Sequence, residues 1–349
     1  MRDAAAALRS AGVKAIYLAG SSIGLDTLGV LADLARIFPS ARDDVRRVSR
    51  RIVAEMGGEL GTFGDRYALT LESTLHETGG VNIPVDLFHW SGENHHIGRA
   101  DGAVRLIDAL ASLDCEPGDR VLLWGHGHAG NVFALATNLL SGDSEAVESF
   151  FRAAEIYYRL PGFGWIDIPV WNRVRRMLLG HAAVVTNLRL DIVTFGTPVR
   201  YGWDCGGYAS LLHFIHRRPA ANCPIHRAGF PIDCDAVLRG AEGDYVQQLG
   251  IAGTNTAPSR FAWRAYVADR RLGALLQPCE PRGSQPDSFR AGTIVPEEGA
   301  TLLVDYGLPA GGVGRHLAGH AVYARPKWLL FHVEQVVRRL YGRRACRAA

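Results

Sequence analysis

Short apolar runs alternate along the chain with longer stretches in which apolar residues recur at helical spacing. Six of these runs have the length and composition of buried strands: residues 13–20, 83–90, 120–125, 188–196, 210–216 and 301–307. Helical spacing is clearest in residues 25–38, 99–113 and 327–340. Strands that alternate with helices predict an α/β protein, with a mainly parallel sheet covered by helices on both faces.

Two stretches interrupt the alternation. Residues 143–182 are rich in aromatic side chains and are divided into short helices by prolines and glycines. Residues 219–299 carry many prolines and glycines around one helical segment, 260–276. We interpret residues 1–349 as a single domain with two insertions. The first, 143–182, is either a lid over a binding cleft or a set of core-covering helices, and the second, 219–299, is loop-rich.

Composition narrows the class of protein. Hydrophobic residues make up 48% of the chain, which predicts a well-filled core, and 38 basic against 35 acidic residues give no nucleic-acid footprint. No apolar stretch approaches the ~20 residues of a membrane span, and no signal peptide is evident, so a cytoplasmic protein is expected. The cysteines form no C-x-x-C pair, although a disulfide can form among Cys205, Cys223 and Cys234.

The most distinctive run is residues 121–130, Val-Leu-Leu-Trp-Gly-His-Gly-His-Ala-Gly, followed by an apolar helical stretch. A buried strand, a tight turn of small residues and a helix form the layout of the G-x-S-x-G nucleophile elbow. Gly125 and Ala129 are the small neighbours that such a strained turn requires. The central position, where the elbow presents its attacking hydroxyl, is Gly127.

The run Gly-His-Gly-His-Ala-Gly resembles the G-H-S-H-G-G elbow of lipases and esterases of the α/β-hydrolase superfamily, with serine replaced by Gly127. Other segments resemble the same superfamily, and together they span residues 13–341. Strand 13–20 with Ser21-Ser22-Ile23-Gly24 is similar to the first strand and its oxyanion loop. Residues 194–198, Thr-Phe-Gly-Thr-Pro, resemble the strand end after the elbow helix, and 319–323, Gly-His-Ala-Val-Tyr, resemble the loop of the catalytic histidine.

The resemblance implies an α/β-hydrolase fold and a catalytic set in the chain order nucleophile, acid, histidine. Gly127 occupies the nucleophile position, and His320 falls at the histidine, with His316 as its nearest competitor. The acid lies among Asp233, Asp235 and Asp244. We favour Asp244, because it precedes a short apolar turn that can dock on the end of the sheet.

The resemblance also implies an oxyanion hole of backbone N–H groups. These come from His128 and from the residues around Ser21 and Ser22, with His126 beside them in the binding site. Backbone donors survive a side-chain substitution, so this part of the site is expected to remain despite Gly127.

The implied function is that of a lipase- or esterase-like serine hydrolase acting on carboxylic ester or acyl bonds, without a cofactor or metal. The aromatic stretch 143–182 favours an apolar acyl group. Glycine cannot form an acyl-enzyme, so the chain is expected to be inactive or strongly impaired. Three explanations of Gly127 stay open: an engineered knockout, a natural pseudoenzyme, or slow hydrolysis by water that His320 activates.

Three hypotheses compete. Gly125-x-Gly127-x-x-Gly130 also matches the dinucleotide fingerprint, which expects a strand ending in an acidic residue about 20 positions later. His126 and His128, with His95-His96, suggest a metal-dependent hydrolase, although no third ligand motif follows. A binding or scaffold protein, with its cleft filled by the aromatic residues of 143–182, is the third hypothesis.

The polar run at the end of strand 83–90 has two interpretations. Because the carboxyl ends of parallel strands share one edge, Ser91, Glu93, Asn94 and His95 either line the same cleft as the elbow or cap the next helix through side-chain hydrogen bonds.

Overall fold

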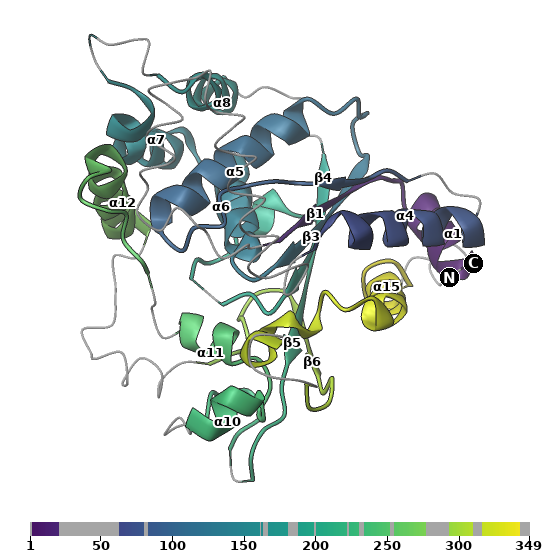
Figure 1. The fold of residues 1–349 in the computed structure, drawn as a ribbon. Coiled ribbons are helices and arrows are strands. Elements are labelled where there is room, and N and C mark those ends of the chain that lie inside the picture. The colour runs from purple at the N-terminus through teal and green to yellow at the C-terminus, as the bar shows by residue number, and fades with distance from the viewer. Residues whose placement is uncertain are drawn as a thin grey trace.

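A computed structural model describes residues 2–20, 63–79, 83–160, 162, 167–180, 188–198, 200–221, 223–229, 234–251, 255–276, 293–309 and 316–342. Ser21, Ser22 and the helix expected at 25–38 lie outside these ranges. In Figure 1 a central sheet lies between two groups of helices. The predicted class, an α/β protein with helices on both faces of a parallel sheet, is confirmed.

The sheet has six strands, all parallel, in the order β2-β1-β3-β4-β5-β6. Each predicted apolar run contains one strand. They are β1 Val13–Ala19, β2 Val85–Leu87, β3 Arg120–His126, β4 Arg189–Phe195, β5 Ser210–His216 and β6 Ala300–Val304.

The strand order reverses between β1 and β3. The chain runs outward from β1 to β2, then crosses back to β3 and continues through β4, β5 and β6. In open parallel sheets, ligands bind beyond the carboxyl ends of the strands at such a switch point. The end of β3, where the elbow motif lies, is therefore the first place to look for a site.

One face of the sheet is covered by a thick helical layer. Val121 and Leu123 of β3 face this layer, and alternate residues of the same strand face the opposite one. The layer consists of α5 His96–Ala111, α6 Ala129–Ser141, α7 Ser144–Tyr158, α8 Pro169–Leu179 and α12 Trp263–Leu276.

The aromatic residues of the 143–182 stretch belong to this core. Phe150, Phe151 and Tyr158 pack around Trp171 with ring centroids 5.0–6.0 Å from its own. The Trp171 indole donates a hydrogen bond to Asp101 of α5 (Nε1 to Oδ1, 2.8 Å). Helix α8 contacts α5 and α7, and α7 also contacts α12. The division of the chain into one domain with two insertions stays a prediction.

The opposite face is covered by helices from the two ends of the described chain. Leu122 and Trp124 of β3 point to this side. The helices are α1 Arg2–Ser10, α4 Asp65–Gly79 and α15 Leu329–Val336. The helix predicted at 327–340 is divided, because a 3₁₀ turn, Pro326–Trp328, precedes α15 and a π-helical turn, Val337–Tyr341, follows it.

Short elements complete the carboxyl edge of the sheet. The 219–299 stretch contains α10 Cys234–Arg239 and α11 Tyr245–Ile251 in addition to α12, and both pack against a 3₁₀ segment, Leu317–Val322. A second 3₁₀ segment is Cys205–Gly207. Cys115, Cys205 and Cys223 are free thiols. None of the helices in the described ranges is long and apolar enough to cross a membrane.

Candidate functional site

The turn after β3 has the backbone shape that the elbow motif predicts. Strand β3 ends at His126, and α6 begins at Ala129. Between them Gly127 has φ +57°, in the left-handed region that L side chains rarely adopt. The Gly127 N–H donates to the Phe195 carbonyl oxygen (2.9 Å), and its carbonyl oxygen accepts from Thr197 Oγ1 (2.8 Å). Both backbone groups of Gly127 are thus held by the end of β4.

The start of α6 approaches the same segment closely. A Cβ at Gly130 would collide with the Thr197 side chain, whose hydroxyl is already bonded to Gly127. Glycine at position 130 therefore lets the helix begin directly against the end of β4.

His128 supplies a backbone donor at this turn. It is the N-cap residue of α6, and its N–H donates no hydrogen bond to any residue that the structure describes. Asn131 Nδ2 donates to His128 Nδ1 (3.2 Å). Burial and the nearby charges of Arg99 and Arg200 hold the His128 pKa well below 6.5, so the imidazole is neutral. The His128 N–H is thus available to a ligand at the positive end of α6.

The structure brings Asp244 and His320 together. His320 Nδ1 lies 2.8 Å from Asp244 Oδ2. Asp244 is fully buried, and its carboxylate also accepts from Tyr323 OH (3.1 Å) and from the Gln247 N–H (2.9 Å). A carboxylate can only accept, so Nδ1 carries the proton and Nε2 is left with a lone pair. This is the tautomer in which a histidine acts as a general base.

The other acids and the competing histidine lie elsewhere. Asp235 is in α10 and pairs with Arg239 (Oδ2 to Nη2, 2.6 Å), and Asp233 lies outside the described residues. His316 caps the segment before His320, with its Nδ1 accepting from the Gly319 N–H (3.3 Å). Of the carboxylates considered from the sequence, Asp244 is the one that reaches a candidate histidine.

The loop that carries His320 is strained. Leu317 and Ala318 have φ values of 46° and 52°, and Gly319 follows with φ 92°. A left-handed conformation costs an L residue about 1–2 kcal/mol. Two adjacent residues of this kind persist only where surrounding contacts hold them, and such strain clusters at functional sites.

A glycine at the end of β4 makes room for the Asp244 carboxylate. Gly196 has φ +58°, and a Cβ there would collide with Asp244 Oδ2 and with the Tyr323 ring. The Thr-Phe-Gly-Thr-Pro segment thus contacts both Asp244 and the elbow. Gly196 leaves room for the Asp244 carboxylate, and Thr197 donates a hydrogen bond to Gly127.

His126 connects the elbow to the His320 loop. Its Nε2 lies 3.0 Å from the His320 carbonyl oxygen, and the two imidazole rings lie with centroids 4.1 Å apart. Gly127 follows His126 directly, so the elbow and His320 lie on the same side of the sheet. We call Gly127, His128, Asp244, His320 and His126 the elbow cluster. Ser21 and Ser22, the expected oxyanion loop, lie outside the described residues.

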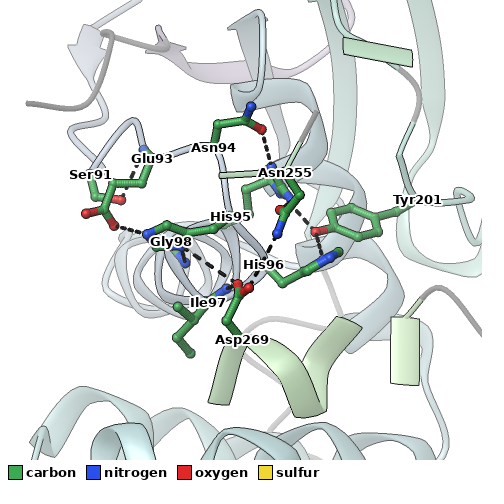
Figure 2. A network of polar contacts seen from close by, with 11 residues as sticks. Ser91, Glu93, Asn94, His95, His96, Ile97, Gly98, Tyr201, Asn255 and Asp269 are labelled. Carbon is green, nitrogen blue, oxygen red and sulfur yellow. Dashed lines mark hydrogen bonds and ion pairs between the residues drawn. The ribbon is translucent and has the colours of Figure 1, made fainter. Parts of the chain in front are cut away.

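A second buried polar cluster lies beside α5 (Figure 2). At its centre is Arg99, which is fully buried and donates to Tyr201 OH (2.8 Å), Asn94 Oδ1 (2.9 Å) and Asn255 Oδ1 (2.8 Å). The Tyr201 hydroxyl lies 2.9 Å from His96 Nδ1. We call this group the Arg99 cluster; its other members are Ser91, Glu93, His95 and Asp269.

The Arg99 cluster holds segments together. His95 is the N-cap of α5, and its Nδ1 accepts from the Gly98 N–H (2.8 Å) while its Nε2 lies 3.1 Å from Glu93 Oε2. Asp269 of α12 accepts from the Ile97 N–H (3.0 Å). Of the two interpretations of residues 91–95, helix capping describes what His95 does.

Consecutive residues after β4 join the two clusters. The Arg200 N–H donates to Asn131 Oδ1 (3.2 Å), and Asn131 in turn donates to His128. The next residue, Tyr201, bonds to Arg99. The three hydrogen bonds of Arg99 all go to uncharged oxygens. The positive charge of Arg99 contributes to the lowered pKa of His128.

Two of the competing hypotheses have structural requirements that can be compared with the chain. The dinucleotide fingerprint requires a strand after its helix, whereas residues 129–158 form α6 and α7 with a short connection and no strand between them. Among the described residues, no group of three or more His, Cys, Asp or Glu side chains could hold a metal ion.

Comparisons with protein-family models, with curated proteins and with solved structures gave no match to this chain.

Sequence reasoning missed several of these polar residues. Tyr323 lies inside the Gly-His-Ala-Val-Tyr segment, so the sequence contained a signal that it lies near His320. Arg99 had a weaker one, as the first residue of the helical stretch predicted at 99–113. Asn255 and Asp269 had none, because Asp269 lies 172 positions from its partner Ile97.

Proposed function

We propose that this chain has the α/β-hydrolase fold and carries an ester- or acyl-hydrolase site whose nucleophile position is Gly127. The observation that carries the proposal is the His320–Asp244 hydrogen bond of 2.8 Å, in a strained loop that contacts the elbow at the switch point of the sheet. Position 127, Asp244 and His320 follow one another in the chain order of that superfamily's nucleophile, acid and histidine.

Each group has a role in acyl transfer. A serine at position 127 would attack the substrate carbonyl and give its proton to His320 Nε2, which would return it to the leaving alcohol. Asp244 orients His320 through Nδ1 and stabilises the imidazolium that forms. The His128 N–H is one donor for the oxyanion, and the positive charge of Arg99 favours negative charge nearby.

With Gly127 in place the covalent route is closed. The remaining groups can act on a water molecule: water attacks the carbonyl carbon, its proton moves to His320 Nε2, and the proton then passes to the departing alkoxide. Such a route lacks an acyl-enzyme, and sites without their nucleophile retain only ~10³–10⁴-fold acceleration over water. The chain is therefore proposed to be a hydrolase scaffold that is silent or strongly impaired.

The choice of acyl group stays open. The aromatic side chains that favoured an apolar substrate include Phe150, Phe151, Tyr158 and Trp171, and these pack into the helical layer. The proposal is accordingly limited to small carboxylic esters, and an apolar preference stays a prediction.

The experiment is Gly127→Ser. The variant should hydrolyse short p-nitrophenyl esters and become labelled at position 127 by a fluorophosphonate, whereas the parent and Gly127→Ala should do neither at a comparable rate. The double variant Gly127→Ser/His320→Gln is the matched control, because it keeps the hydroxyl and removes the base. A folded Gly127→Ser protein that shows neither turnover nor labelling would contradict the proposal.

A further inference from the structure

The His320 loop needs an external restraint. Leu317, Ala318 and Gly319 adopt left-handed backbone conformations in succession, immediately before His320. Within the loop, the Gly319 N–H donates to His316 Nδ1 over 3.3 Å, which is long for a hydrogen bond. A strained segment of this kind keeps its conformation only when contacts from outside determine it.

His126 makes such contacts from the elbow side. It is the last residue of β3 and is fully buried. Its Nε2 bonds to the His320 carbonyl oxygen at 3.0 Å, and because a carbonyl oxygen only accepts, Nε2 carries the proton. Its ring also lies over the His320 ring, with centroids 4.1 Å apart and planes inclined by 31°.

Aromatic rings fix the His126 ring in turn. The Tyr323 ring lies 5.5 Å from it and the Phe63 ring 5.8 Å, the latter edge-on. The Tyr323 hydroxyl donates to Asp244, so the residue that packs on His126 also holds the partner of His320. One side chain therefore contacts both the backbone and the ring of His320, and it is adjacent in sequence to position 127.

We propose that His126 is a positioning residue that locks the strained loop and sets His320 over position 127. This inference rests on the proposed function for its consequence, although the lock itself is a property of the chain as it stands. His126 is not catalytic, because its Nε2 proton is committed to a carbonyl oxygen.

Two variants separate the contributions of His126. In His126→Gln the side-chain amide nitrogen reaches about as far as Nε2, so the donor remains and the ring is lost. In His126→Phe the ring remains and the donor is lost. A third variant, His126→Asn, has an amide too short to reach the carbonyl and serves as a second donor-removal variant if the phenylalanine protein does not fold.

The first measurement uses the Gly127 protein and needs no turnover. Proton NMR of histidine-labelled protein follows the Nδ1–H of His320, which is shared with Asp244. Removal of the donor at position 126 should abolish this protected resonance, while His126→Gln should retain it.

The second measurement places the same variants in the Gly127→Ser background. Loss of the donor should lower kcat by about 10²-fold, the effect of a misplacement near 1 Å, with little change in KM. His126→Gln should recover most of the lost kcat. If His126 merely filled space, glutamine would not restore it.

The outcomes are distinguishable. If His126→Phe and His126→Asn both keep the Nδ1–H resonance of the parent, His126 is not the lock. If the resonance is lost but the Gly127→Ser background shows no turnover with any residue at 126, the lock stands and the proposed function fails.

Discussion

Two buried polar clusters lie beside the same sheet, and they use their hydrogen bonds differently. In the Arg99 cluster the bonds of Arg99 join four segments of chain, and the backbone around it is unstrained α5. In the elbow cluster Gly127 is left-handed, and so are Leu317 and Ala318 of the loop that carries His320. Among the residues described, His320 Nε2 and the His128 N–H donate or accept no hydrogen bond.

Under the proposed function, this difference separates a cluster that stabilises the fold from one that would react with a substrate. Burial of polar groups is common to both clusters and therefore does not distinguish them. Left-handed backbone at non-glycine residues, Leu317 and Ala318, occurs in the loop that carries His320 and, among the residues described, not in the Arg99 cluster. Stabilising structure satisfies its polar groups, whereas a reacting site keeps some of them for a substrate.

The largest expected effect compares equivalent carboxylates. In the Gly127→Ser background, Asp244→Asn should lower kcat by about 10⁴-fold, because an amide in place of the carboxylate no longer enforces the reactive tautomer of His320. Asp269→Asn, the same change in the Arg99 cluster, should alter kcat by less than about threefold. Ester hydrolysis by the two purified variants measures both, and equal losses would remove the distinction between the clusters.

The next effect is on stability, and here a change in the Arg99 cluster should matter more than one in the elbow cluster. Arg99→Met should lower the free energy of unfolding by about 3 kcal/mol, because it strands buried oxygens of Tyr201, Asn94 and Asn255. His320→Ala should cost less than about 1 kcal/mol, since Asp244 keeps two other donors. Urea unfolding gives both values. Arg270→Met, at an exposed position of α12, is the control and should change little.

The elbow backbone predicts a smaller stability change. Gly127→Ser and Gly127→Ala should each lower the free energy of unfolding by about 1–2 kcal/mol, because both force an L side chain to φ +57°. Gly12→Ala is the matched control: φ is +83° there and a Cβ would meet nothing within 4 Å, so it isolates the backbone cost. If either residue 127 variant proves as stable as the parent, the turn has relaxed from the elbow shape.

The last effect is a pH dependence of stability within the Arg99 cluster. Burial, and then the charges of Arg99, Arg200 and His95, lower the His96 pKa to about 3. Between about pH 6.5 and 3 the unfolded chain binds a proton there that the folded protein does not. Stability is therefore complete above pH 6.5 and is lost as the pH falls, by up to about 1.4 kcal/mol per pH unit.

His96→Gln should make that slope shallower by about 1 kcal/mol per pH unit when urea unfolding is repeated between pH 4 and 7. His332, whose pKa burial alone lowers to about 3, offers a comparison outside both clusters. His332→Gln should flatten the slope similarly. Unchanged slopes in both variants would show that these histidines titrate alike in the folded and unfolded states.

Much of the sheet could be predicted from the sequence, because the inner strands β1, β3, β4 and β5 are largely buried on both faces and read as apolar runs. The helices were harder. Helices α10 and α11 are only 6 and 7 residues long, which is too short to show a helical period. The apolar spacing of α15 continues into a π-helical turn, and this spacing alone does not distinguish such a turn from an α-helix.

The candidate site was predictable where it rests on local sequence. The elbow turn is encoded by adjacent small residues, and Asp244 was favoured from the apolar turn that follows it. The strain at Leu317 and Ala318 was not predictable, since neither residue favours a left-handed conformation. The Arg99 cluster was not predictable either, because the bonds that join its segments connect residues more than 100 positions apart, as between Arg99 and Tyr201.

The left-handed backbone at Gly127 has a consequence for how such a protein could change. The bend forms without a side chain at its centre, and glycine is the residue that holds it at least cost. Under the proposed function, a silent and a reactive protein differ by the residue at this single position. A library varied at that codon alone would sample serine, cysteine and aspartate in one preformed frame.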